Sequence, residues 1–400
     1  MIRLLASLGT GFDCASRAEI LQILNIGVDP SQIIFANPCK PDSFIRYAAK
    51  AGVDTMTFDN TDELYKIART HRGARLVVRI LTDDSKSLCR LGLKFGAPLA
   101  TVPTLLATAR QLGLDVVGVS FHVGSGCYDA NAFEDAVSRA SQAFGMGIAV
   151  GYRFTLLDVG GGFESQNFEQ TAAVLNRAIQ TYFPRAKQQG VRIIAEPGRY
   201  FVSEAFQLAA NVIARRVSPA KPIAADNDAI GDMEMDYTPP VGCGDEDQPS
   251  VMCESTLIHI AAQASNHHLC VDYINDGVYG SFNCIVFDHQ KVTPYPLTLR
   301  RSPVPSALAG ARQPVRDKLS IVWGPTCDSI DCVTPLCMLP ESLDVGDWLG
   351  FDNMGAYTLC AASTFNGFET SEVYYTSGAS AQEGAAVRNA LAIYNAACAY

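Results

Sequence analysis

The chain has 400 residues, of which 48% are hydrophobic and 18% charged, and its formal net charge is −10. This length and apolar content suffice for a large core divided over about two domains. The composition excludes the clustered lysine and arginine of a nucleic-acid-binding surface, and no apolar run reaches the roughly 18 residues of a transmembrane helix.

The apolar opening of the chain, residues 1–8, does not read as a signal peptide. It lacks a charged leader, a long apolar run and a small-residue cleavage site. Thirteen cysteines are scattered along the chain without a CxxC motif or a paired framework. They predict the reduced thiols of a cytoplasmic protein and give no reason to expect a metal site.

Short β-branched runs alternate with amphipathic segments through the first half of the chain. We predict strands at 11–14, 33–36, 55–58, 76–80, 116–122, 156–159 and 193–196. Helices are predicted between them at 17–24, 43–51, 63–69, 130–144 and 168–183. This order predicts a parallel sheet with helical crossovers, which is either an open doubly wound sheet or a closed barrel.

Polar or reactive residues recur where these strands end, and this favours the barrel, whose function gathers at the carboxyl ends of many strands. The residues are Asp13, Asn37, Asp59, Arg79, His122, Gly160 and Glu196. Seven strands are visible where such a barrel has eight. Because the chain opens in a helix-like stretch, the pattern places the remaining strand before Met1.

The second half of the chain is predicted to be mainly β, as a sheet or sandwich. Strands are predicted at 207–215, 269–274, 284–287, 319–323, 348–351 and 373–375. We therefore expect a barrel domain at 1–205 and a C-terminal β domain at 206–221 and 268–376. A segment at 222–267 has many acidic residues and no lysine or arginine, which predicts a disordered surface loop or an acidic docking element. The tail, 377–400, is predicted to hold a helix.

Three glycines, Gly160, Gly161 and Gly162, leave one of the apolar strands together. Glycines here let backbone N–H groups approach a phosphate closely. The alternative is a tight turn with no ligand.

The next strand ends in Glu196-Pro197-Gly198-Arg199. A carboxylate and an arginine three residues apart suit a ligand with one basic nitrogen and one phosphate, and pyridoxal phosphate is such a ligand. A structural ion pair at the strand end would explain the same two charges.

A further strand leads into His122 and a Gly-Ser-Gly turn that holds Ser125. The imidazole could stack on a flat ring, and Ser125 could donate to phosphate, although a lone histidine is more often a core residue. Arg79 and Asp13 would add one positive and one negative charge to the same end of the barrel.

In the second half, Cys327 and Asp328 lie on a Gly-Pro turn, and Phe287 and Asp288 follow a predicted strand. An exposed cysteine beside an acid is a candidate proton donor. Two carboxylates would suit a distal ammonium group. Packing cysteines and surface acids are the alternatives.

Taken together, these runs resemble eukaryotic ornithine decarboxylases of the alanine-racemase-like barrel group, which use pyridoxal 5′-phosphate. The similar runs are 11–16, 35–40, 82–86, 122–126, 160–162, 196–199, 276–284, 323–328 and 353–358. The resemblance covers the chain from residue 9 to about residue 375, apart from the acidic segment. It implies decarboxylation of L-ornithine to putrescine, the first step of polyamine biosynthesis.

The resemblance also implies a role for each matched residue. Glu196 would pair with the pyridine nitrogen, and His122 would stack on the ring. Asp288 and Asp328, next to Phe287, would bind the side-chain amine of the substrate, and Cys327 would return a proton to the carbon that loses carbon dioxide. The phosphate would be held by Ser125, Gly162, Gly198, Arg199 and Tyr357, with Asp13, Arg79, Gly160, Gly161 and Pro197 close to the cofactor.

In the resembled family Cys327 and Asp328 serve the cofactor of the neighbouring subunit, which implies a head-to-tail homodimer, and antizyme is a candidate regulator. The lysine that holds the cofactor covalently belongs to a Tyr-Ala-Val-Lys-like run ahead of residues 4–13. The sequence contains no such run, and Lys40 matches a different position of the family. The resemblance therefore implies that the chain as given is inactive.

Two other functions stay open at this stage. One is a non-catalytic relative like the antizyme inhibitors, and the other is a decarboxylase for lysine or another basic amino acid. The matched Cys327, Asp328, Asp288, Glu196 and Arg199 favour the ornithine enzyme, because a relative released from catalysis would be free to change them. Lysine differs from ornithine by one methylene, which is worth only about 1–3 kcal/mol of discrimination.

Overall fold

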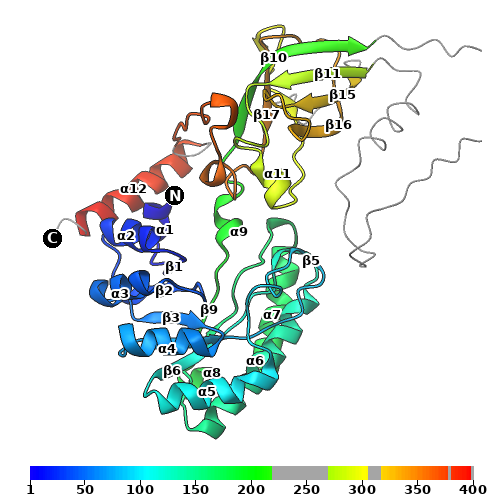
Figure 1. Cartoon of the computed structure of the whole chain (residues 1–400). Helices are drawn as coiled ribbons and strands as arrows, with labels where there is room; N and C mark the ends of the chain where they lie inside the picture. Colours follow the sequence, from blue (N-terminus) through cyan, green and yellow to red (C-terminus); the bar gives the residue numbers. More distant parts are fainter. Residues whose placement is uncertain (219–268, 305–316, 377–379, 398–400) are drawn as a thin grey trace, which may run out of the picture. The chain divides into compact units, whose positions relative to one another are not determined.

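A computed structural model of the chain describes residues 1–218, 269–304, 317–376 and 380–397. It divides into two compact units (Figure 1), one formed by Met1–Ala205 with Glu372–Tyr400 and the other by Phe206–Ser371. The predicted acidic segment at 222–267 lies outside the described residues. None of the described helices is both long and apolar enough to cross a membrane.

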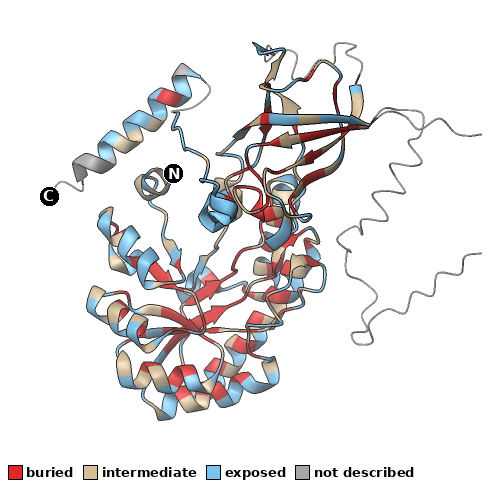
Figure 2. Ribbon diagram, turned by 45° about the horizontal axis from the view of Figure 1, so that its top comes forward, coloured by how far each residue is buried: buried red, intermediate tan, exposed pale blue. Residues whose placement is uncertain are grey.

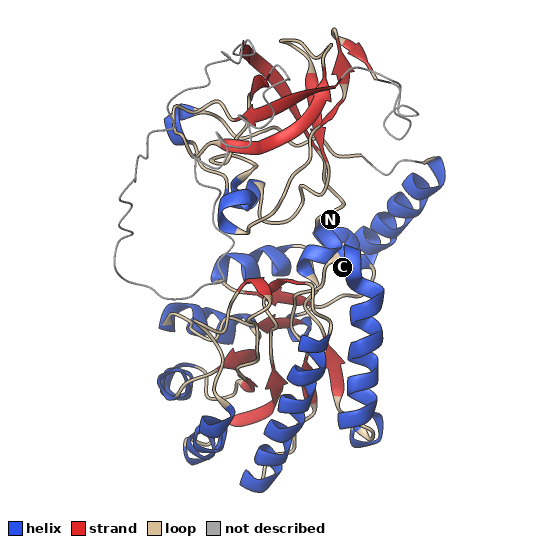
Figure 3. Ribbon diagram, turned by 90° about the vertical axis from the view of Figure 1, so that its right-hand side faces the viewer, coloured by secondary structure: helices blue, strands red, loops and turns tan. Residues whose placement is uncertain are grey.

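The first unit is built on a parallel sheet of seven strands with helices outside it (Figure 3). In sheet order the strands are β1 (Phe12–Cys14), β2 (Ile33–Phe35), β3 (Thr55–Phe58), β4 (Arg75–Arg79), β6 (Asp115–Ser120), β8 (Leu156–Asp158) and β9 (Arg192–Ile194). The helices are α2 (Arg17–Asn25), α3 (Asp42–Ala51), α4 (Thr61–Thr70), α5 (Val102–Gln111), α6 (Asn131–Val150), α7 (Phe168–Tyr182) and α8 (Ala186–Gln189). The predicted barrel-type sheet with helical crossovers is confirmed, and β1 and β9 are its two edges.

Local sequence signals explain where several of these helices begin and end. The side chain of Ser16 accepts a hydrogen bond from the Glu19 N–H ahead of α2, and Asn60 does the same for Glu63 ahead of α4. Such caps satisfy N–H groups that have no partner within the helix. Helices α3 and α6 end at Gly52 and Gly151, both in the left-handed conformation that glycine adopts without a steric penalty.

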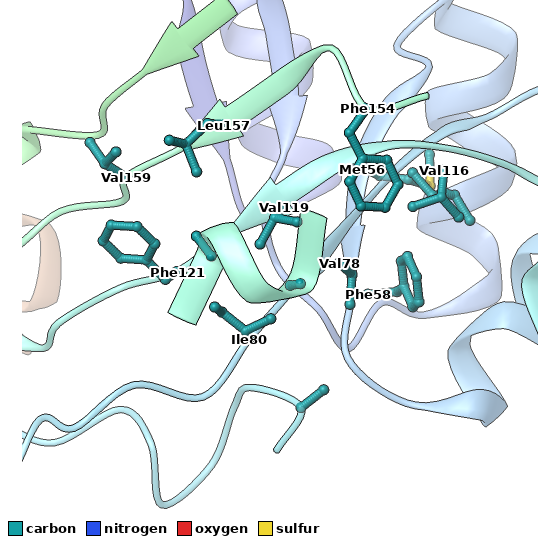
Figure 4. Close-up of a cluster of buried hydrophobic side chains, with 14 of the residues drawn as sticks. Met56, Phe58, Val78, Ile80, Val116, Val119, Phe121, Phe154, Leu157 and Val159 are labelled. Carbon is teal, nitrogen blue, oxygen red and sulfur yellow. The ribbon is translucent and has the colours of Figure 1, made fainter. Parts of the chain in front are cut away.

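The strands separate two apolar layers because successive side chains point to opposite faces. The outer layer packs under the helices and is the main core of this unit; Figure 4 shows part of it, including Val119, Phe121, Leu157 and Val159. The inner layer is small and consists of Ile34, Val77, Val117 and Leu156, with Ala36 and Ile194 against them. The buried colouring of the strands in Figure 2 reflects both layers.

The two ends of the chain belong to this first unit. Helix α1 (Ile2–Ser7) precedes β1 and lies against α12 (Ala381–Ala397), as Figure 1 also shows. On α12, Gly384 is buried and Val387 and Leu391 are half-buried. Their spacing of three and four residues places them on one face of the helix.

The second unit is built on a six-stranded sheet with one parallel pairing, between β11 and β15. Its strand order is β12 (Tyr295–Pro296), β17 (Trp348–Phe351), β10 (Leu208–Ser218), β11 (Leu269–Ile274), β15 (Asp317–Trp323) and β16 (Cys332–Pro340). A core that includes Val212, Ile274, Phe282, Leu349 and Phe351 packs against it. The predicted C-terminal sheet domain is confirmed.

Two strand predictions in the second half were wrong. Residues 284–287 belong to the short helix α11 (Asn283–Phe287), because the Asn283 side-chain amide donates to the Gly280 and Thr358 carbonyls and fixes a turn there. The β-branched run predicted a strand, but these tertiary hydrogen bonds decide the conformation. Residues 373–375 form no strand either, and Val373, Tyr374 and Tyr375 are exposed.

Candidate active site

A layer of polar side chains lies on the inner face of the sheet, beyond the inner apolar layer and toward the carboxyl ends of the strands. Phe12 and Cys14 pack in the outer core, so Asp13 between them faces inward. Arg79 follows Val77 by two residues, and Asp158 follows Leu156 by two, so both share the inner face. Glu196 continues the face of Ile194 in the same way.

The charges in this layer perturb one another. Burial of its carboxyl raises the pKa of Asp13 well above the usual value, and the charge of Glu196 adds to that rise. The residue as a whole is still reached by solvent. Burial, together with the charge and hydrogen bond of Asp158, also raises the pKa of Glu196 well above its usual value. Burial lowers the pKa of Arg79, while the surrounding carboxylates oppose that shift. The carboxyls of Asp13 and Glu196 therefore keep their protons to a higher pH than exposed carboxyls do.

His122 follows β6 and stands next to the glycines that follow β8. Burial first, and then the charge of Arg79, lower its pKa to about 3, so the imidazole is neutral. Its Nδ1 accepts a hydrogen bond from the Gly124 N–H at 3.0 Å, which leaves the ring proton on Nε2. A Cβ on Gly161 would come within 2.7 Å of that Nε2, so glycine is needed for the close approach.

The other two glycines of the run hold the loops after β6 and β8 together. Gly160 has φ +63°, and a Cβ there would lie 2.0 Å from the Phe121 carbonyl oxygen. Gly162 has φ +98°, and a Cβ there would lie 2.6 Å from the Gly124 carbonyl oxygen. Any side chain at these positions would separate the loops.

Ser125 and Arg199, which are far apart in sequence, meet at this end of the first unit. The Arg199 guanidinium donates to the Ser125 hydroxyl at 3.1 Å and forms an ion pair with Glu164 at 3.2 Å. Ser125 begins the short strand β7 (Ser125–Cys127), which pairs with β5 (Ser87–Cys89). The short helix α9 (Gly198–Val202) carries Arg199. Gly198 is its first residue, and Pro197 occupies the N-cap position.

The second unit positions Cys327 and Asp328 on the turn after β15. Cys327 is exposed, and Asp328 accepts a hydrogen bond from the Tyr279 hydroxyl at 2.5 Å. This bond lowers the pKa of Asp328. The turn is held by the buried Asp331, which accepts from both the N–H and the hydroxyl of Thr326.

The other predicted residues of the second unit lie on two further segments. Phe287 ends α11 with an exposed ring, and Asp288 directly after it is buried. Tyr357 is exposed and has φ +52°.

The one lysine among the buried polar residues that the structure describes is Lys40, and it is turned away from the inner layer. Its Nζ forms an ion pair with Glu63 on α4 at 3.0 Å and donates to the Asn37 and Thr57 carbonyls. The Nζ also lies over the Phe35 ring, which belongs to the outer core. Burial lowers the pKa of Lys40 to about 8. These contacts give Lys40 a structural role in the outer core, under the helices.

Comparison with known proteins agrees with this arrangement. The profile of "Pyridoxal-dependent decarboxylase, pyridoxal binding domain" matches residues 1–203, and that of "Pyridoxal-dependent decarboxylase, C-terminal sheet domain" matches residues 249–355. The chain belongs to the pyridoxal-dependent decarboxylase family. The family uses pyridoxal phosphate, and the resemblance drawn from the motifs is confirmed.

Individual relatives of this decarboxylase include an enzyme and a regulator. It is 47% identical to ornithine decarboxylase of Rattus norvegicus over 94% of this chain and 72% of that protein. It is also 47% identical to antizyme inhibitor 2 of Xenopus laevis, over the same shares of the two chains. Among solved structures, the Paramecium bursaria Chlorella virus arginine decarboxylase bound to agmatine aligns with a TM-score of 0.74 and 32% identity, covering 92% of this chain and 85% of that one.

The first unit fits pyridoxal phosphate by the chemistry of its donors. A carboxyl at Glu196 suits a basic ring nitrogen, and the neutral, half-buried His122 offers a flat ring for stacking. Arg199 and Ser125, already hydrogen-bonded to each other, converge as donors for a phosphate beside a glycine-rich loop.

Sequence reasoning missed two residues that the structure brings into this site. Asp158 is fully buried in the inner layer, and Glu164 is buried in its ion pair with Arg199. Asp158 stands directly before the glycine motif, and the alternation of the strand would have placed it on the same face as Gly160. Glu164 had no comparable signal, because its partner lies 35 residues further along the chain.

Proposed function

We propose that this decarboxylase converts L-ornithine to putrescine and carbon dioxide in the cytoplasm, as a homodimer. The observation that carries the proposal is the convergence of Glu196, His122 and Arg199 at the carboxyl ends of one parallel sheet. The ten cysteines with a described environment are free thiols, which suits a reducing compartment. Identity of 47% to the rat ornithine decarboxylase supports ornithine as the substrate.

The residues divide the chemistry between them. Pyridoxal phosphate, when bound, supplies an electron sink for the charge left at the α-carbon when the carboxyl group departs. Glu196 would hold the ring nitrogen, His122 would pack on the ring, and Arg199 and Ser125 would bind the phosphate. Asp13 and Arg79 shape the charge around this site, and Pro197 and Gly198 carry the arginine into place.

Residues of the second unit would act on the substrate. Asp288 and Asp328, with Phe287 beside them, would bind the distal ammonium group, and the low pKa of Asp328 keeps it ionised for that task. Cys327 would return a proton to the α-carbon after its bond to the carboxyl carbon breaks. Tyr357 would add a donor to the phosphate.

The substrate is tested by release of labelled carbon dioxide from carboxyl-labelled ornithine, lysine and arginine. We expect kcat/KM for ornithine to exceed that for lysine by about tenfold or more, because one methylene is worth about 1–3 kcal/mol. Equal rates for lysine would contradict the proposed substrate. Asp328→Asn should raise KM for ornithine, and Asp344→Asn, at a position outside these roles, is the control.

Covalent attachment of the cofactor is tested separately, by borohydride reduction of residues 1–400 incubated with pyridoxal phosphate. Lys40 is enclosed by Glu63 and two carbonyls, so we expect no pyridoxyl-lysine at that residue.

The homodimer is tested by mixing two variants of a preparation that decarboxylates ornithine, at a cofactor concentration too low to fill the weakened site of Arg199→Ala. If Cys327 serves the cofactor of the partner subunit, Cys327→Ala and Arg199→Ala protomers should restore about a quarter of the activity on mixing, since half the dimers would then carry one intact site. No recovery from a preparation shown to exchange subunits would contradict shared sites.

A regulatory function without chemistry is the second candidate, and the similarity to the Xenopus antizyme inhibitor 2 favours considering it. Such a protein would bind antizyme and leave ornithine unchanged. Binding of antizyme by this chain with no pyridoxal phosphate binding at any concentration tested would favour the regulator over the enzyme.

A further inference from the structure

We propose that Asp158 and Glu196 form a proton-sharing carboxyl pair on the inner face of the barrel, in which Asp158 is a positioning residue that sets the protonation of Glu196. The inference deepens the proposed function, on which its consequence for the cofactor rests. The pair itself rests on the placement and contacts of the two side chains.

The register of β8 and β9 places the two carboxyls on the same face. Asp158 is paired with Ile194, the Val159 N–H donates to the Ile194 carbonyl at 2.9 Å, and the Glu196 N–H donates to the Gly160 carbonyl at 2.8 Å. Glu196 thus stands two residues beyond Ile194, the partner of Asp158, just past the end of β9. Leu157 and Val159 point the other way, into the outer core (Figure 4), so Asp158 faces inward with Glu196.

The surroundings of Asp158 leave one of its oxygens to Glu196. The side chain has no solvent exposure, and its Oδ1 accepts the Gly160 N–H at 3.0 Å. Its buried Oδ2 receives no hydrogen bond from any amide or hydroxyl of the described residues. A buried carboxylate oxygen without a donor is costly, and the neighbouring carboxyl of Glu196, which acts on the pKa of Asp158 through a hydrogen bond, would supply that donor when it carries a proton.

The charges of the layer show which partner holds the proton. Burial raises the pKa of Asp158 to about 6, and the hydrogen bond from Glu196 counteracts part of that rise. For Glu196, burial and the charge and hydrogen bond of Asp158 all act upward, and only Arg79 opposes them. When the pair holds a single proton, that proton is therefore expected on Glu196 rather than on Asp158, as for two carboxyls that share one site.

This arrangement gives Asp158 a function although it is too buried to touch a ligand. A protonated Glu196 would hold a proton beside the place of the basic ring nitrogen. With the nitrogen protonated, the Glu196 carboxylate would lie next to its positive charge, and Asp158 would add a second negative charge behind it.

The test is a carbon-13 NMR titration of the cofactor-free protein labelled at the glutamate side-chain carboxyl, with Glu196→Gln to assign the resonance. We expect the Glu196 carboxyl to titrate in two coupled steps above the range of the other glutamates. In Asp158→Asn, which keeps an acceptor for the Gly160 N–H and removes the like charge, the midpoint should fall by about one pH unit or more, a tenfold change in the protonation equilibrium.

Asp13→Asn is the matched control, because it removes a neighbouring carboxyl of the same layer that acts on Glu196 only through space. It should lower the midpoint by less than half as much. An equal shift in Asp13→Asn, or none in Asp158→Asn, would overturn the pair. If Asp158→Asn does not fold, the parent protein still decides, since a single step for Glu196 at the usual value for glutamate would overturn the pair as well.

Titration of pyridoxal phosphate separates this inference from the proposed function. If the protein binds the cofactor but Asp158→Asn does not shift the titration midpoint of Glu196, the carboxyl pair is refuted and the proposed function stands. If Asp158→Asn shifts that midpoint but the protein does not bind pyridoxal phosphate, the proposed function is refuted and the carboxyl pair stands.

Discussion

Replacing Arg199 with alanine is expected to weaken pyridoxal phosphate binding by a factor that the contacts of its guanidinium allow us to bound. One nitrogen of the guanidinium is 3.2 Å from the Glu164 carboxylate, and another donates to Ser125 at 3.1 Å. A guanidinium has five N–H groups. These two contacts hold the guanidinium beside Ser125, where its N–H groups would donate to a phosphate.

Hydrogen bonds to charged groups are worth about 1.5–3 kcal/mol each. Since Ser125 and the glycine loop continue to hold the phosphate, we expect a net loss of about 2–3 kcal/mol, or about 30- to 150-fold in Kd. Part of the loss could come from Glu164, which Arg199→Ala leaves buried without its partner. The double variant Arg199→Ala/Glu164→Gln removes that unpaired charge and isolates the phosphate contact.

The dissociation constant is measured by fluorescence titration or equilibrium dialysis with the unreduced cofactor. Arg139→Ala is the control, because Arg139 also pairs with a carboxylate, Asp135, but on the exposed surface of α6. It should bind the cofactor within about twofold of the parent, since exposed pairs of this kind are worth only a few tenths of a kcal/mol. Recovery of full affinity in the double variant would refute phosphate binding by Arg199, as would unchanged affinity in Arg199→Ala itself.

Three further outcomes are expected. Glu63→Gln should lower the unfolding free energy of the first unit by about 3 kcal/mol, because it removes the charged partner of the buried Lys40; denaturant melts check this, and a change below 1 kcal/mol would contradict it. In the parent, the unfolding free energy should rise between about pH 8 and about pH 10, because folding depresses the pKa of Lys40 and the unfolded chain then binds more protons; Lys40→Met should flatten that rise. Gly160→Ala should destabilise the first unit and abolish cofactor binding, since its Cβ would lie 2.0 Å from the Phe121 carbonyl oxygen. Denaturant melts and cofactor titrations measure these two effects, and unchanged stability and affinity would contradict the expectation.

Local sequence signals were enough to predict most of the first unit and much of its site. Short β-branched runs that alternate with amphipathic helical segments predicted a parallel sheet with crossovers, because each pattern depends only on neighbours along the chain. The glycine run and the Glu-Pro-Gly-Arg motif predicted a phosphate and a basic nitrogen in one ligand, because both follow strand ends. The carboxyl ends of the strands meet in any parallel barrel, so residues as distant in sequence as Asp13 and Glu196 could be assigned to one layer.

Other features depended on contacts between distant segments, which only the tertiary structure determines. Apolar residues 284–287 form a helix because Asn283 bonds to Thr358, 75 residues away. Lys40 lies under the helices because Glu63 on α4 receives it, and nothing in the run around Lys40 indicates that direction. The sequence alone predicted that Glu196 is the acid at the ring nitrogen. The tertiary structure showed that Asp158 on the neighbouring strand raises its pKa, because the register of two strands brings the carboxyls together where water cannot separate their charges.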